Sequence, residues 1–148
     1  MHGTALLSIL NIDSSRKIGK KEQNLKEMLF FGENFPLDSD KDILEINSPK
    51  NSIYGPWFVV HKDLTQRWAI VIMHWKKTPC LGIRWFNGNQ GTPSVRGFAT
   101  WLVIPDKLSS AVLSQLPIAS SDRKEIDDIL LGEYAIPELQ QKMLANKF

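Results

Sequence analysis

Four stretches in the middle of the chain are rich in β-branched and aromatic residues, and polar turn formers separate them. They cover residues 56–62, 67–75, 80–86 and 98–104. Val, Ile, Phe and Trp are enriched in strands, and short connections favour antiparallel pairing of consecutive strands. The pattern therefore predicts an antiparallel four-stranded meander over about residues 56–104.

Apolar residues recur at helical spacing on both sides of this segment. After it, three stretches have this spacing: 106–116, 122–131 and 137–144. Asp106 and Asp122 are the expected N-caps of the first two. Before it, a weaker stripe runs from Ile18 to Leu29, and residues 33–56 form an irregular connection. The prediction is a single α+β domain over residues 1–148, in which N- and C-terminal helices flank the sheet.

The hairpin of residues 67–86 divides its side chains between two faces. With the turn at Lys77-Thr78, Trp75 lies opposite Cys80, and Ile72 lies opposite Ile83. One face consists of core residues: Trp68, Ile70, Ile72, His74, Leu81, Ile83 and Trp85. The other face mixes apolar residues with two arginines: Arg67, Ala69, Val71, Met73, Trp75, Cys80, Gly82, Arg84 and Phe86.

The second face is either covered by a helix or open for a partner. Gly82 lies in the middle of it and lacks a side chain, which indicates the close approach of another group. The apolar stripes of the predicted helices must pack somewhere, and this favours coverage. The polar stretch 87–97 is long for a hairpin connection, so it is either a functional loop or a flexible tip.

The composition is that of an ordinary globular domain, with 43% hydrophobic and 23% charged residues in a chain of 148. It excludes collagen, coiled coil and general disorder, and the single Cys80 excludes an internal disulfide framework. The apolar run 5–10 is too short for a signal peptide. The run 68–73 is far below the ~20 residues of a membrane helix. We therefore expect a cytoplasmic protein that does not associate with membranes.

The sequence lacks the side-chain sets on which catalysis and metal binding usually depend. His2, His61 and His74 have no second His or Cys at ligand spacing, and no HExxH or CxxC motif is present. Cys80 lies in an apolar strand, which would raise the thiol pKa rather than activate the thiol. No GxSxG, GxxxxGK[ST] or GxGxxG motif occurs. We expect no catalytic residue, metal or cofactor, and an enzyme with an unrecognised acid/base site remains an alternative.

Charge and aromatic residues provide two candidate binding surfaces. All five tryptophans lie within residues 57–101. Residues 57–107 carry seven bases and two acids, and residues 27–49 carry six acids and one base. The basic aromatic candidate surface consists of Arg67, Trp75, Arg84, Phe86 and Arg96. The acidic candidate surface consists of Glu33, Asp38, Asp40, Asp42 and Glu45. Arginine and tryptophan dominate binding hot spots, and segregated charge steers partners.

Two functions of different classes follow. The first is a non-catalytic protein-binding module, such as a small cytoplasmic immunity, antitoxin or accessory protein, whose partner is another protein. The second is a single-stranded nucleic-acid-binding protein that uses aromatic stacking and backbone neutralisation on the sheet. One observation that distinguishes the two functions is whether the face that carries Arg84 is open or covered. The other is which partners the protein captures before and after nuclease treatment.

Overall fold

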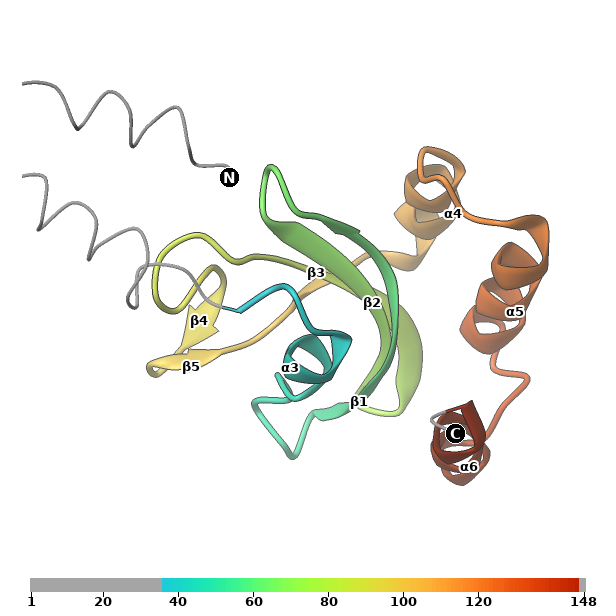
Figure 1. The fold of residues 1–148 in the computed structure, drawn as a ribbon. Helices are drawn as coiled ribbons and strands as arrows, with labels where there is room; N and C mark the ends of the chain where they lie inside the picture. Colours follow the sequence, from blue (N-terminus) through green and yellow to red (C-terminus); the bar gives the residue numbers. More distant parts are fainter. Residues whose placement is uncertain (1–35, 147–148) are drawn as a thin grey trace, which may run out of the picture. The chain divides into compact units, whose positions relative to one another are not determined.

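Four strands form one antiparallel sheet in the computed structural model, which describes residues 36–146 (Figure 1). The strands are β1 (Ile53–Asp63), β2 (Trp68–Trp75), β3 (Thr78–Trp85) and β6 (Leu102–Ile104). They pair in the order β1-β2-β3-β6, so each strand lies beside the previous one in this set. The predicted four-stranded antiparallel meander is confirmed, and with the flanking helices it makes an α+β domain.

The turn between β2 and β3 is formed by Lys76 and Lys77, whose φ angles are 49° and 73°. Two consecutive positive φ angles are typical of a tight hairpin turn. Trp75 therefore lies opposite Thr78, and Ile72 lies opposite Leu81. The predicted register was wrong by two residues. Because side chains alternate with a period of two, the shift leaves every residue of the hairpin on its predicted face.

The predicted strand 98–104 is divided in two. Leu102–Ile104 joins the main sheet as β6, whereas β5 (Phe98–Ala99) pairs with β4 (Ser94–Val95) in a separate two-stranded ribbon. The ribbon turns at Arg96 and Gly97, which have φ angles of 52° and 82°. The stretch 87–97 therefore includes half of this ribbon.

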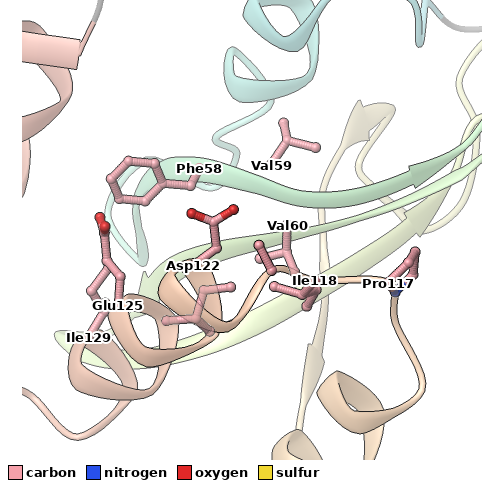
Figure 2. Close-up of a pocket in the computed structure, with 10 residues that line it drawn as sticks. Phe58, Val59, Val60, Pro117, Ile118, Asp122, Glu125 and Ile129 are labelled. Atoms are coloured by element: carbon pink, nitrogen blue, oxygen red, sulfur yellow. The ribbon is translucent and has the colours of Figure 1, made fainter.

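Three helices follow the sheet: α4 (Asp106–Ser114), α5 (Ser120–Leu130) and α6 (Ile136–Asn146). Their order confirms the three predicted C-terminal helices, but the predicted caps are wrong. Pro105 precedes α4 as its N-cap, and Ala119 precedes α5, with no side-chain capping bond at either position. Figure 2 shows α5 near β1, with Asp122 and Glu125 directed into the space between helix and strand.

A short helix, α3 (Asp40–Leu44), lies in the stretch that was predicted to be irregular. Its five residues are too few to produce a detectable helical period. Ile43 is its buried residue. The predicted helix over 18–29 lies outside the residues that the structure describes.

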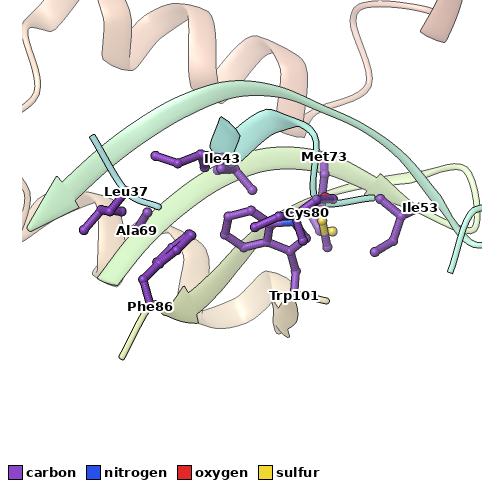
Figure 3. Close-up of a cluster of buried hydrophobic side chains, with 10 residues drawn as sticks. Leu37, Ile43, Ile53, Ala69, Met73, Cys80, Phe86 and Trp101 are labelled. Atoms are coloured by element: carbon purple, nitrogen blue, oxygen red, sulfur yellow. Dashed lines mark hydrogen bonds between the residues drawn. The ribbon is translucent and has the colours of Figure 1, made fainter. Parts of the chain in front are cut away.

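The sheet separates two apolar cores. On one side, the segment around α3 and the side chains of Phe86 and Trp101 pack against Ala69, Val71 and Met73 (Figure 3). On the other side, α4, α5 and α6 supply Leu113, Ile126, Ile129 and Leu139, which pack with Trp57, Ile70, Ile72, Leu81 and Ile104. We refer to these two sides as the α3 face and the helix face. No helix among residues 36–146 is long and apolar enough to cross a membrane.

Candidate functional site

The face that carries Arg84 is the α3 face, and it is closed. Ala69, Val71, Met73, Cys80, Gly82, Arg84 and Phe86 are all buried. The cover consists of Leu37, α3, Ile46 and Trp101, and Trp101 donates its indole N–H to the carbonyl oxygen of Ile46 at 2.7 Å. The α3 segment and Trp101 thus cover this face, whereas the three C-terminal helices pack on the other one.

Gly82 allows this closure. A Cβ atom at Gly82 would lie 3.1 Å from Cβ of Trp101 and 3.1 Å from Sδ of Met73. Such distances are shorter than ordinary van der Waals contact, so a larger residue would push the cover away from the sheet. The close approach that was inferred from Gly82 is that of Trp101.

Arg84 is fully buried and organises the segment that follows β3. Its Nη1 donates to the carbonyl oxygens of Thr100 at 2.7 Å and Pro93 at 3.2 Å, and its Nη2 donates to that of Gln90. Its Cζ lies 5.1 Å from the ring centre of Phe86. Burial lowers the pKa of the guanidinium from 12.5 to about 10, which leaves it charged at neutral pH.

The structure does not bring the basic aromatic candidate surface together. Arg84 and Phe86 are fully buried, so the expectation that they lie at an accessible surface is wrong. Arg67 directly precedes β2 and Trp75 is its last residue, and both are half-buried. Arg67 Nε donates to the carbonyl oxygen of Phe86 at 3.4 Å. Arg96 is exposed at the turn of the β4–β5 ribbon, which carries the exposed Phe98.

The acidic candidate surface is only partly gathered in α3. Asp40 and Asp42 lie in this helix, Asp38 precedes it and Glu45 follows it, while Glu33 lies outside the described residues. Lys62 of β1 lies 3.0 Å from Asp40 and also donates to the carbonyl oxygen of Asp38 at 2.9 Å. One carboxylate of the set is thus paired within the domain.

The exposed apolar surface of the sheet lies on the helix face, where sequence reasoning placed only core residues. Trp85 is 39% exposed and Leu102 is 54% exposed, while His61, Trp68 and Ile83 are half-buried. Trp68 lies directly opposite Trp85, and Ile83 lies directly opposite Leu102. We call these five residues the aromatic strip. It crosses all four strands next to the part of this face that the helices cover.

A β-bulge adds His61 to the aromatic strip. Val59 lies opposite Val71, but His61 lies opposite Ile70, so Val60 is the extra residue of β1. Val59 accordingly packs in the α3-face core, whereas Val60 packs in the helix-face core. The ring of His61 lies 5.2 Å from that of Trp68. Bulges often re-aim a side chain in this way, and the alternating pattern of the sequence gives no sign of one.

The remaining potentially reactive side chains, His74 and Cys80, are buried within the domain. Nδ1 of the buried His74 accepts a 2.8 Å hydrogen bond from Nε1 of Trp57, and burial lowers the pKa of His74 from 6.5. Burial also raises the pKa of the Cys80 thiol to about 11, which agrees with the expected inert thiol. No group of three His, Cys, Asp or Glu residues within 36–146 is arranged to hold a metal ion.

Comparison with known proteins adds no relative: no family model, curated protein or solved structure matches this chain.

Proposed function

We propose that this chain is a non-catalytic protein-binding module and that the aromatic strip is its contact surface. The observation that supports this is the exposure of Trp85 and Leu102 on adjacent strands, beside the packed rings of His61 and Trp68. Tryptophan is enriched in binding hot spots because it combines a large contact area with low rotamer entropy. A rigid sheet presents these side chains at fixed spacing, so little ordering free energy is lost on binding.

The charge pattern favours a protein over single-stranded nucleic acid. A stacking platform for nucleic acid places cations beside the aromatic rings. The lysine and arginine of β1 and β3 lie on the opposite face: Lys62 bonds to the α3 segment, and Arg84 is fully buried against the ring of Phe86. Among the four described strands, the helix face thus carries the aromatic residues without lysine or arginine.

The test compares two exposed leucines. Leu102→Arg places a charge in the aromatic strip, whereas Leu131→Arg places the same charge on a leucine at the end of α5 that is 77% exposed. Partners are purified from the native host with four full-length proteins: wild type, Leu102→Arg, Leu131→Arg and Trp85→Ala. Each purification is done without and with nuclease. The salt concentration is about 0.5 M, where charge interactions are strongly screened.

We expect a defined protein that wild type and Leu131→Arg retain and that Leu102→Arg and Trp85→Ala lose. Loss of all partners on nuclease treatment, with binding to single strands at low salt, would support the nucleic-acid alternative instead. Equal retention by all four proteins would place the contact surface elsewhere.

A further inference from the structure

A second feature of the helix face is a groove between β1 and α5. It has a volume of about 320 Å³. Its apolar lining includes Phe58, Val60, Ile118, Ile126 and Ile129, and the connection 117–119 also lines it (Figure 2). Ligand pockets span roughly 300–1,000 Å³. The groove is therefore large enough for a few side chains but not for a folded domain.

Two carboxylates provide the charge of the groove. Asp122 and Glu125 are three residues apart on α5, so they project from one side of the helix, toward Phe58 of β1 (Figure 2). The other lining residues, from β1, from the connection 117–119 and from α5 itself, are uncharged. The lining of the groove thus carries only negative charge.

The two carboxylates differ in their partners. Oε1 of Glu125 lies 3.0 Å from Nζ of Lys142 in α6, so this charge is already balanced. Asp122 is exposed and forms no ion pair with any residue of the described part of the chain. Asp122 is therefore the carboxylate that can receive a cation from a ligand.

The strand that borders the groove is an edge strand. β1 pairs with β2 on one side, and no described strand pairs with its other side. Pro56 and the bulge at Val60 limit regular pairing along this edge to a short stretch. Phe58 lies in that stretch and Val60 lies at its end, and both line the groove. A short extended peptide can pair with such an edge while its side chains enter the adjacent groove.

We propose that this groove binds a short extended segment of a partner protein, in which a bulky apolar side chain stands next to a lysine or arginine. The apolar side chain fills the space lined by Ile118, Ile126 and Ile129, and the cation pairs with Asp122. The negative lining opposes phosphate groups, so nucleic acid is not the ligand of this groove. The groove and the aromatic strip share no residue, so each site can be tested without the other.

The experiment uses the full-length chain and capped fluorescent heptapeptides with a central Leu, Phe or Trp. The residues on either side of the centre are Lys, Ser or Glu. Binding is measured by fluorescence anisotropy, and the isoleucine methyl signals of the protein are followed by NMR. Asp122→Asn removes the proposed cation partner, and Asp106→Asn is its matched control, because Asp106 lies in the first turn of α4, outside the groove.

We expect saturable binding whose affinity decreases from Lys-flanked to Ser-flanked to Glu-flanked peptides. The chemical-shift changes should be concentrated at the methyl groups of Ile118, Ile126 and Ile129. Asp122→Asn should weaken the Lys-flanked peptides by about 2- to 5-fold, as for a partly exposed ion pair, and should leave the Ser-flanked ones unchanged. Asp106→Asn and Trp85→Ala should leave the affinities of the Lys-flanked and the Ser-flanked peptides unchanged. Absence of saturable binding, an affinity order that ignores charge, or shifts confined to other methyl groups would overturn the proposal. A loss through Trp85→Ala alone would assign the peptides to the aromatic strip.

Discussion

Nη1 of Arg84 donates a 2.7 Å hydrogen bond to the carbonyl oxygen of Thr100, sixteen residues further along the chain. The same guanidinium donates to the carbonyl oxygens of Pro93 and Gln90. One buried cation thus holds three points of the segment between β3 and β6. This segment also delivers Trp101 to the α3 face, so the arginine and the closure of that face are linked.

Removing the Arg84 guanidinium should destabilise the domain. Arg84→Met keeps an unbranched side chain but leaves the three carbonyl oxygens without this donor. Hydrogen bonds to a charged group contribute roughly 1.5–3 kcal/mol each, but the substitution also removes the desolvation cost of a buried charge. We therefore expect a net loss of about 3 kcal/mol in the free energy of unfolding. Arg96→Met, at the exposed ribbon turn, should change it by less than about 0.5 kcal/mol. Urea unfolding measures both, and equal costs would contradict the role of Arg84.

The pairing of Trp57 with His74 predicts a pH dependence of stability. Burial lowers the pKa of His74 from 6.5, so the folded state keeps this ring neutral where the unfolded chain binds a proton. Stability should therefore be constant above about pH 6.5 and fall below it, by at most about 1.4 kcal/mol per pH unit.

His74→Gln isolates this contribution. Glutamine retains an acceptor for the indole N–H of Trp57 but does not titrate. Urea unfolding of both proteins at a series of pH values, from about pH 5 to 8, gives the difference in the free energy of unfolding. We expect this difference to be flat above the ordinary histidine pKa and to change below it. Parallel curves for wild type and variant would show that His74 is not the group responsible.

The Cys80 thiol should react slowly in the folded protein. Its pKa is raised from 9.0 to about 11, so the thiolate fraction near neutral pH is roughly 100-fold below that of a free cysteine. The chain has a single cysteine, so labelling with iodoacetamide reports on this thiol alone. We expect fast labelling in urea and slow labelling in buffer. Cys80→Ala should keep partner binding, and complete loss of binding in a folded variant would reopen a role for the thiol.

The alternating pattern of the sequence predicted the two faces of the sheet because it depends only on a period of two. The pattern did not predict which parts of each face are buried, because burial depends on how far the helices and loops packed on that face extend. Trp85 and Ile70 belong to the same face, but Ile70 lies under the helices and Trp85 lies beyond them. The α3 face is covered in part by α3, whose five residues are too few to show a helical period in the sequence.

The candidate site was predicted less well than the fold, for reasons that concern particular residues. An arginine in a strand usually indicates a surface, but Arg84 finds enough backbone carbonyls to be buried. The bulge that moves His61 to the helix face is a backbone irregularity, and the residue types around Val60 do not encode it visibly. The apolar residues of the helix face extend beyond the area that the three C-terminal helices cover. This excess of apolar residues is the sequence signal for the aromatic strip.

The last prediction uses two isoleucines on the helix face. Ile72 is fully buried beneath the helices, whereas Ile83 is half-buried in the aromatic strip. Ile72→Ala should lower the free energy of unfolding by about 2–5 kcal/mol through lost contacts and a cavity. Sequence alone predicts the same cost for Ile83→Ala. The exposure of Ile83 reduces the expected cost to about 1–2 kcal/mol, because the neighbouring water can fill the space.

Urea unfolding of the two variants measures this difference in the isolated protein. A larger cost for Ile72→Ala supports an open strip, and a weaker affinity of Ile83→Ala for the captured partner would then place Ile83 in the interface. If both substitutions cost the same, Ile83 is covered in the isolated chain. In that case the aromatic strip is part of the core, and its role as a contact surface is wrong.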